Sequence, residues 1–255
     1  MFRDETTAVC GAAKKKMELL EKNPLGYWLM SILAGPFIGL GSVLMGVVGG
    51  VFTAGGAYST KLVCGCVFAV GLCLVTVAGA ELFTGNNFVM AMAGFRKELA
   101  WGKIVKLWVV CWLGNLIGSV LTAVVFTATG IGTGDVAAYL ANAAATKAAG
   151  AALPLFTKAI FCNICVCLAI WCGTKLKSEG AKLAMNFACV MTFVTCGFEH
   201  SVANMTFLTI GLLNPAGMSI PVAGVIMNLV IVTLGNMVGG IVCVALPYYL
   251  IAREK

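Results

Sequence analysis

Two acidic residues and a histidine interrupt long apolar stretches of this sequence, an unusual place for side chains that ionise. His200 is the only histidine in the chain, and it follows Glu199 within the stretch GFEHSVANM at 197–205. Glu81 lies in a second polar stretch, GAELFTGNN at 79–87. An imidazole has a pKa of about 6.5, so it can attract an anion as imidazolium or donate one hydrogen bond as the neutral ring. Because His200 stands in such an interruption, we interpret it as functional rather than as ordinary packing.

These two polar stretches repeat one pattern. Both read Gly-x-Glu-x-x-x-x-Asn, with Gly79, Glu81 and Asn86 in the first and Gly197, Glu199 and Asn204 in the second. A second matched pair, GNLIGS at 114–119 and GNMVGG at 235–240, follows at nearly the same spacing. His200 corresponds to Leu82 in the first copy, so the repeat itself does not require a histidine. Two matches in the same order indicate a duplicated unit.

Composition places the chain in a membrane. Hydrophobic residues make up 60% of it and charged residues only 11%, whereas charged residues are about 25% of soluble proteins. A helix needs about 20 apolar residues to cross the hydrocarbon core. We predict six spans, at about 27–51, 62–95, 104–127, 156–173, 183–213 and 222–251. The second and fifth contain the polar stretches and are longer than one simple span.

Three spans per copy is an odd number, so the second copy must cross in the opposite direction to the first. The sequence therefore predicts an all-α membrane protein with six transmembrane helices in an inverted 3+3 repeat, with helices two and five broken. Broken backbone at membrane depth must be buried in protein or line a watery cavity. Polar side chains are expected to satisfy the backbone groups that the breaks free. The candidates are Glu81, Asn86, Asn115, Asn163, Glu199, Asn204 and Asn236.

Basic residues set the expected orientation. With six spans, 14 of the 17 lysines and arginines fall on one side, and Lys61, Lys147 and Lys158 fall on the other. Because cytoplasmic loops are enriched in lysine and arginine, we predict a multi-pass protein of the cytoplasmic (inner) membrane with both termini in the cytoplasm. The net charge of +7 follows from these residues and favours contact with membrane lipid, not with nucleic acid.

The chain is expected to have three parts. A cytoplasmic amphipathic segment at 1–26 either closes the cytoplasmic mouth or lies on the membrane surface. A six-helix transmembrane channel domain follows at 27–252, and 253–255 form a cytoplasmic C-terminus.

Twelve cysteines raise a redox enzyme as an alternative, but their setting argues against it. Nearly all lie in apolar segments, where cysteine acts as a small apolar residue. Cys162 and Cys165 have the spacing of a metal or redox pair, yet no second pair or histidine stands nearby in the sequence to complete a zinc site. One histidine also cannot supply bis-histidine haem ligation. We therefore predict no metal, no cofactor and no enzymatic activity.

The two polar stretches, together with WLGNLIGS at 112–119 and GNMVGG at 235–240, resemble the formate–nitrite transporter family, which also includes hydrosulfide channels. The resemblance extends from about residue 27 to residue 251. It implies an aquaporin-like fold, a homopentamer, and one pore through each protomer that passes small monovalent anions.

The resemblance also implies roles for individual residues. Thr84 and His200 would meet the passing ion, Lys147 would attract anions from the loop before the fourth span, and Asn163 would lie beside the pore. The narrow points would be formed by Phe68, Leu72, Leu82, Phe83 and Phe193. Apolar constrictions exclude hydrated and multivalent ions, since stripping water from charge is costly. A hydroxyl and an imidazole between them would replace part of the lost hydration.

Three functional hypotheses remain open from the sequence. The first is a channel for hydrosulfide, formate or nitrite, with hydrosulfide favoured because so many thiols suit a reducing setting. The second is a formate or nitrite transporter in which His200 gives the anion a proton. The third is a neutral-solute channel, suggested by Asn214-Pro215-Ala216, which has the sequence of the aquaporin motif. However, this motif occurs only once in the chain and lies outside the predicted breaks.

Overall fold

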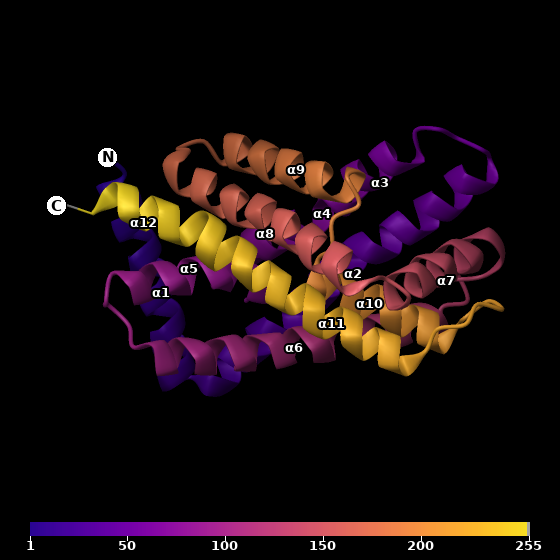
Figure 1. Cartoon of the computed structure of the whole chain (residues 1–255), viewed down its shortest axis with the longest axis horizontal. Helices are drawn as coiled ribbons and strands as arrows, with labels where there is room; N and C mark the ends of the chain where they lie inside the picture. The colour runs from indigo at the N-terminus through magenta and orange to yellow at the C-terminus, as the bar shows by residue number, and fades with distance from the viewer. Residues whose placement is uncertain (254–255) are drawn as a thin grey trace.

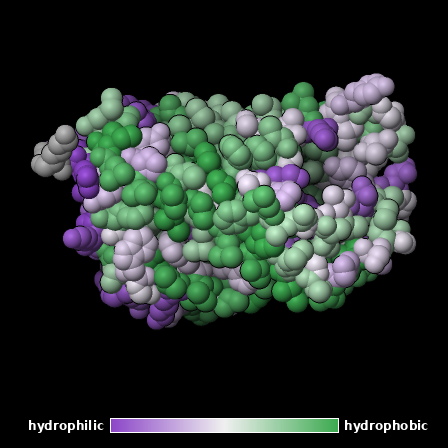
Figure 2. All heavy atoms as spheres, in the orientation of Figure 1, coloured by the Kyte–Doolittle hydropathy of each residue, from purple (hydrophilic) through white to green (hydrophobic). Residues whose placement is uncertain are grey.

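The protein is a bundle of helices whose two chain termini lie at the same end. The computed structural model describes residues 1–253, and every regular element in that range is a helix. Both termini lie at the left in Figure 1, and we call this side the terminal end and the other side the opposite end. Hydrophobic side chains cover the middle of the molecule, and hydrophilic ones gather most densely at the terminal end (Figure 2).

Six crossings connect these two ends, with one short helix before them and one between the third and the fourth. The first half comprises α1 (Arg3–Lys22), α2 (Pro24–Ala54), α3 (Thr60–Phe68), α4 (Val70–Leu74), the π-helical turn η1 (Val75–Gly79), α5 (Phe83–Phe95) and α6 (Trp101–Ala128). The second half comprises α7 (Gly134–Ala148), α8 (Ala152–Lys175), α9 (Glu179–Thr195), α10 (Ser201–Leu213), α11 (Val222–Val238), η2 (Gly239–Ala245) and α12 (Leu246–Ala252). The all-α fold with breaks in the second and fifth crossings is confirmed.

Five helices of the described chain are long and apolar enough to span a bilayer without help. The fifth crossing is not among these five helices, because the break at 196–200 divides it into α9 and α10, each too short to span a bilayer. The second crossing is divided in the same way, at 80–82. The five long helices and the divided fifth crossing together account for the six predicted spans.

Glycines let the outer helices of each half pack backbone to backbone. A β-carbon on Gly35 of α2 would stand 2.4 Å from backbone atoms of Gly118 and Ser119 in α6. In the second half, a β-carbon on Gly235 of α11 would stand 2.6 Å from the carbonyl oxygen of Phe156 in α8. The α2–α6 and α8–α11 contacts are therefore equivalent in the two halves, as an inverted repeat requires.

The amphipathic helix α1 packs against the terminal end of the bundle. Its apolar side buries Val9, Cys10, Ala13, Met17 and Leu20. Salt bridges tie its polar side to the second crossing and its following turn, from Lys16 to Glu81 at 2.6 Å and from Lys14 to Glu98 at 2.8 Å. Both interpretations of this segment, closing the cytoplasmic mouth or lying on the membrane surface, stay predictions. Its cytoplasmic location stays a prediction.

The Glu98 contact makes the packing of α1 depend on pH. The hydrogen bond from Lys14, reinforced by the charge of Arg96, holds the pKa of Glu98 below its ordinary value of 4.5 despite partial burial. A lowered pKa in the folded state means that the contact stabilises fully above the unfolded pKa and is lost as pH falls through the folded one. We expect an acid protease to cut α1 faster in Glu98→Gln than in the parent near pH 5. Equal cutting rates are expected at pH 2, and equal rates at both pH values would contradict the prediction.

Candidate ion pathway

The two helix breaks meet in the centre of the bundle, and each begins at a glycine in the left-handed region. Gly79 has φ +86° and Gly197 has φ +72°, values that favour glycine over residues with a β-carbon. At the second break, hydrogen bonds from Gly197 N–H to Val194 O and from Phe198 N–H to Phe193 O close a Schellman motif that ends α9. The repeated glycine of the sequence pattern is thus the residue that stops each half-helix.

One asparagine from the last crossing of each half binds the restarted helix. The Asn115 side chain accepts from Phe83 N–H at 2.9 Å and donates to the carbonyls of Ser31 and Glu81 at 2.7 and 2.9 Å. The Asn236 side chain accepts from Ser201 N–H at 2.9 Å and donates to the carbonyls of Ala159 and Glu199 at 2.8 and 2.9 Å. These are the asparagines of the GN pairs, and they satisfy broken backbone as the sequence suggested.

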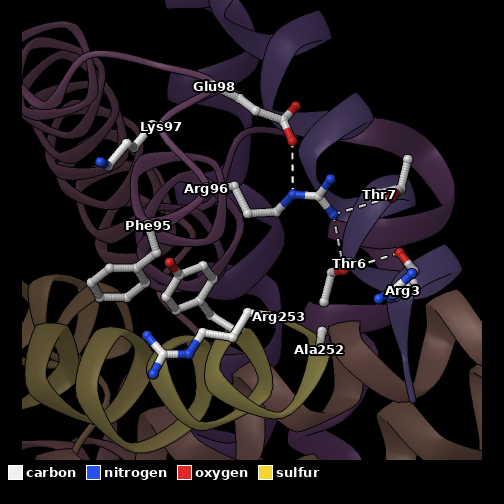
Figure 3. Close-up of a pocket in the computed structure, with 10 residues that line it drawn as sticks. Arg3, Thr6, Thr7, Phe95, Arg96, Lys97, Glu98, Ala252 and Arg253 are labelled. Atoms are coloured by element: carbon white, nitrogen blue, oxygen red, sulfur yellow. Dashed lines mark hydrogen bonds and ion pairs between the residues drawn. The ribbon is translucent and has the colours of Figure 1, made fainter. Parts of the chain in front are cut away.

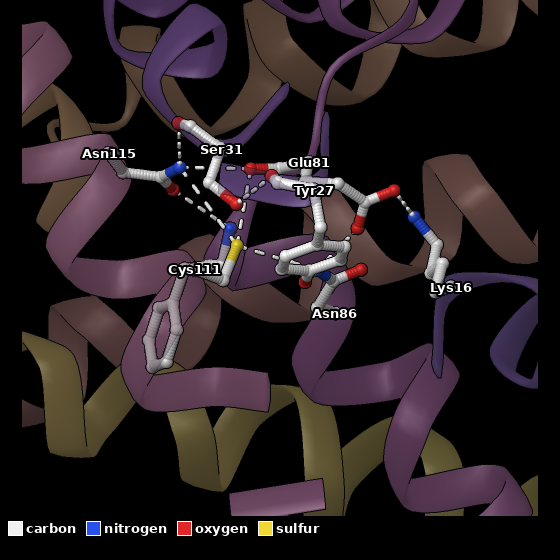
Figure 4. A network of polar contacts seen from close by, with 8 residues as sticks. Lys16, Tyr27, Ser31, Glu81, Asn86, Cys111 and Asn115 are labelled. Atoms are coloured by element: carbon white, nitrogen blue, oxygen red, sulfur yellow. Dashed lines mark hydrogen bonds and ion pairs between the residues drawn. The ribbon is translucent and has the colours of Figure 1, made fainter. Parts of the chain in front are cut away.

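The glutamates of the breaks pair with lysines and do not bind broken backbone as the asparagines do. The Glu81 carboxylate accepts from Lys16 at 2.6 Å and from the Asn86 amide at 2.8 Å, within the network of Figure 4. Its side chain therefore pairs with a lysine, and it does not cap free backbone N–H groups as expected. Asn86 likewise contacts side chains, the hydroxyl of Tyr27 and the thiol of Cys111, and not backbone.

The second half repeats this arrangement with its own lysine. Glu199 accepts from Lys147 and from Asn204, both at 2.7 Å. Asn204 also donates to Asn228, whose amide donates to the Lys147 carbonyl at 2.9 Å. Lys147 was expected in a loop, but it lies in the last turn of α7, because the alanine-rich segment before it is helical. Each break therefore carries a Lys–Glu–Asn chain whose glutamate and asparagine are buried and whose lysine is partly exposed.

Removing one member of such a pair leaves a buried charge without a partner. We expect Lys147→Met to lower the free energy of unfolding by up to about 3–5 kcal/mol, since Glu199 is only 7% exposed. The double variant Lys147→Met/Glu199→Gln is expected to recover most of that loss. Denaturant titration of the purified protein measures both, with Lys61→Met as the matched control. A double variant no more stable than Lys147→Met would refute this account of the pair.

Thr84 and His200 contact each other where the two restarted helices meet. Thr84 Oγ1 lies 3.0 Å from His200 Nε2, and both side chains are almost fully buried. His200 is the N-cap of α10, where its Nδ1 accepts from Ala203 N–H at 3.1 Å. An accepting Nδ1 carries no proton, so the neutral ring holds its proton on Nε2 and donates it toward Thr84. The Thr84 hydroxyl hydrogen is then free to point at a third group.

A cavity of about 330 Å³ reaches this pair from the opposite end. His200, Phe68 and Phe193 line its inner part, with the two phenyl rings edge to face at 6.0 Å and Phe193 stacked on the imidazole at 5.9 Å. Lys147 and Glu199 line its wall. Two of the five predicted constriction residues, Phe68 and Phe193, are thus brought together beside His200.

A second cavity of about 340 Å³ opens at the terminal end, below α1. Leu72 and Leu82 line it together with Glu81 of the first break and Lys16 of α1. The two cavities have no lining residue in common. The buried Thr84–His200 contact therefore lies between the two phenylalanines of the first cavity and the two leucines of the second.

Two predicted site residues lie elsewhere. Phe83 lines neither cavity: it faces a separate apolar hollow beside Trp108 and Trp112 of α6, because its backbone N–H is turned to Asn115. Asn163 is fully buried and donates to the carbonyls of Thr84 and Asn236 at 3.1 and 2.7 Å. It holds the backbone behind Thr84 and, like Phe83, lines neither cavity.

Sequence reasoning missed two lysines. Lys61 and Lys158 line the opposite cavity with Lys147, so all three basic residues assigned to the minority side of the membrane converge on one opening. Their signal was present in the sequence, since lysines placed against the general charge asymmetry need a reason other than orientation.

The features behind the other hypotheses lie away from this centre. Asn214 caps α10 near the opposite end, where its amide donates to Gly132 O, so the Asn-Pro-Ala motif is not in either break. All twelve cysteines are free, and the described residues contain no metal-binding group of three or more Cys, His, Asp or Glu side chains. Burial raises the pKa of Cys10 in α1 to about 12, which keeps that thiol protonated.

Comparison with known proteins agrees with this architecture. Residues 4–250 match the family described as "Formate/nitrite transporter". The nitrite transporter NirC of Escherichia coli (strain K12) is 35% identical over 254 residues, which cover 98% of this chain and 92% of the relative. A solved structure described as an FNT family ion channel superposes with a TM-score of 0.93 at 32% identity, over 99% of this chain and all of that one. A pentameric formate channel with formate bound gives 0.76 at 30% identity, over 91% and 98%.

Proposed function

This chain belongs to the formate/nitrite transporter family, which comprises transporters and channels and not enzymes, and we propose that it passes small monovalent anions through a pore in each protomer. The observation that carries the proposal is the contact between Thr84 and His200, buried between two cavities that open at the two ends. The proposal also covers the route that the anion takes, the identity of the anion and the assembly of the protomers.

Charge and size support this route. Lys61, Lys147 and Lys158 outnumber Glu199 around the opposite cavity, so the opening carries a net positive charge that concentrates anions. Phe68 and Phe193 then exclude ions that cannot shed their water, which favours small monovalent anions over hydrated or multivalent ones. At the centre, the Thr84 hydroxyl and the Nε2–H of His200 supply hydrogen bonds that replace part of the lost hydration.

The same geometry bears on proton transfer. A histidine that gave a proton to the anion would first have to be an imidazolium, with protons on both ring nitrogens. Protonation of Nδ1 would place two N–H groups against each other, because Ala203 N–H already donates to Nδ1. We therefore propose that His200 acts as a neutral hydrogen-bond donor in this state, and that proton-linked transport requires the Ala203 contact to open.

Assembly and orientation follow the relatives. One relative structure is a pentameric formate channel, and we propose a homopentamer for this chain as well. The charge asymmetry supports placing the terminal end, and with it segment 1–26 and the C-terminus, in the cytoplasm. Of the expected C-terminal part at 253–255, residues 254–255 lie outside the described residues.

Uptake into proteoliposomes tests the function. Hydrosulfide, formate, nitrite and chloride are compared at matched pH, with and without protein. Hydrosulfide remains the sequence-based choice, whereas the named relatives carry nitrite and formate. We expect uptake of the weak-acid anions well above that of chloride. Anion uptake no greater than in protein-free vesicles, or osmotic water flow without anion flux, would contradict the proposal.

A further inference from the structure

A cavity of about 430 Å³ lies at the terminal end, apart from the ion pathway. It is bounded by the first turns of α1, the turn between α5 and α6, and the end of α12 (Figure 3). Its lining holds four basic residues and one acidic residue: Arg3, Arg96, Lys97, Arg253 and Glu98. It shares no lining residue with either cavity of the pathway.

The acidic residue and one of the basic residues are already occupied by contacts within the protein. Glu98 accepts from Lys14 and from Arg96 Nε, each at 2.8 Å. Arg96 Nη1 donates to the hydroxyls of Thr6 and Thr7 at 3.0 and 3.1 Å, as Figure 3 shows. The Thr7 hydroxyl hydrogen is therefore free to donate.

Lys97 and Arg253 supply the surplus charge. Within residues 1–253, neither side chain makes a hydrogen bond or a salt bridge, although both line the cavity. General charge asymmetry explains basic residues at this end of a membrane protein. It does not explain why both line one hollow at this end of the bundle.

The backbone at Lys97 is strained in a way that fixes its position. Lys97 has φ +58°, and the bonds from Lys97 N–H to Gly94 O and from Glu98 N–H to Ala93 O form a Schellman motif at the end of α5. Glycine usually occupies the left-handed position of this motif, as Gly197 does in α9. A lysine stands where glycine is favoured, and backbone strain of this kind concentrates at ligand sites.

From this hollow, its surplus positive charge and the strained lysine, we infer that the cavity binds a phosphate group, supplied by the headgroup of an anionic phospholipid in the adjoining leaflet. Lys97 and Arg253, whose charged ends lie on the same side of the cavity as Phe95 (Figure 3), are its donors. Phe95 and Tyr249, stacked at 5.6 Å, form an apolar wall, and the exposed Leu250 and Ile251 of α12 lie next to it for the acyl chains. Basic pockets between helices at a membrane surface bind such headgroups.

The test titrates the delipidated full-length protein with phosphatidylglycerol and with phosphatidylcholine, and reads bound lipid by native mass spectrometry. Lys97→Asn/Arg253→Gln removes two charges while keeping a residue that tolerates the left-handed backbone. Lys106→Gln/Lys177→Gln removes two exposed charges outside the cavity and is the matched control. A second arm measures inorganic phosphate binding by calorimetry. Thermal unfolding and anion uptake are expected to be unchanged in both variants.

We expect the parent and the control to prefer phosphatidylglycerol, and the cavity variant to bind it about tenfold more weakly. Phosphate binding that the cavity variant alone loses, without a lipid preference, would support the phosphate site and identify a soluble source. The inference is overturned if the parent binds neither probe selectively, or if the control loses as much affinity as the cavity variant. None of these outcomes depends on which anion crosses the pore.

Discussion

Anion uptake is expected to fall about ten- to a hundredfold when Thr84 is replaced by valine, with the protein still folded. Valine keeps the shape of threonine but removes the hydroxyl that lies 3.0 Å from His200 Nε2. A hydrogen bond to a charged group contributes about 1.5–3 kcal/mol, and its loss at the buried centre of the proposed route is expected to raise the barrier by that amount. Initial uptake rates into proteoliposomes at matched protein density measure the effect.

His200→Asn separates the two contacts of the histidine. Asparagine is a good N-cap, so it can still accept from Ala203 N–H and keep the start of α10 intact. It does not reach Thr84 in place of Nε2, and uptake is expected to fall as in Thr84→Val. The pH dependence of the residual flux then decides between the two transport hypotheses. If uptake and its pH profile both stayed at the parental level, His200 would have no part in conduction.

The control for these variants is Thr127→Val in α6. The Thr127 hydroxyl donates only to the carbonyl of Ala123 one turn earlier, and it lines neither cavity of the pathway. Uptake by this variant is expected to remain within about twofold of the parent. A substitution outside the core, the ion pathway and the buried polar networks usually changes the free energy of unfolding by at most about 0.5 kcal/mol. A comparable loss in Thr127→Val would attribute the effect of Thr84→Val to general damage.

Asn236→Leu is expected to cause a large loss of stability. Its side chain satisfies three backbone groups of the second break, at Ser201, Ala159 and Glu199. Each orphaned buried group costs about 1–3 kcal/mol, so the loss is expected to exceed about 4 kcal/mol and to prevent normal assembly. Thermal unfolding and the yield of assembled protein on size exclusion measure it.

Two further asparagines serve as comparisons for Asn236. Asn115→Leu removes the equivalent contacts of the first half and is expected to be about as harmful. Asn186 is also buried, but its amide makes a single hydrogen bond, to Thr76. Asn186→Leu is therefore expected to cost only about 1–3 kcal/mol. The interpretation fails if Asn186→Leu is as damaging as Asn236→Leu.

Much of the fold could be predicted because the membrane leaves few alternatives. Six apolar stretches must form helices, since no other open structure satisfies its backbone in lipid. The repeated Gly-x-Glu-x-x-x-x-Asn pattern located both breaks, and Gly79 and Gly197 do stop the half-helices. The helix α7 escaped prediction because its alanine-rich sequence has no strong apolar periodicity, and its identity depends on packing against α2 and α10.

Prediction of the candidate site was less complete. The sequence singled out His200 and Thr84, and the structure brings them into contact. It suggested that Glu81 and Glu199 cap the broken helices, whereas asparagines from other crossings do so. Phe83 was grouped with the constriction residues from its place in the motif, although its side chain points to α6.

The sequence by itself determined that this chain crosses the membrane six times, that its halves are inverted, and where each half is interrupted. Those properties depend on local composition and on an internal repeat, both of which can be recognised in a single sequence. The tertiary structure alone decided the partners of the polar residues at the interruptions. Lys16 reaches Glu81 from α1, and Lys147 reaches Glu199 from α7. Such pairs join residues far apart in sequence, and their geometry exists only once the helices have packed.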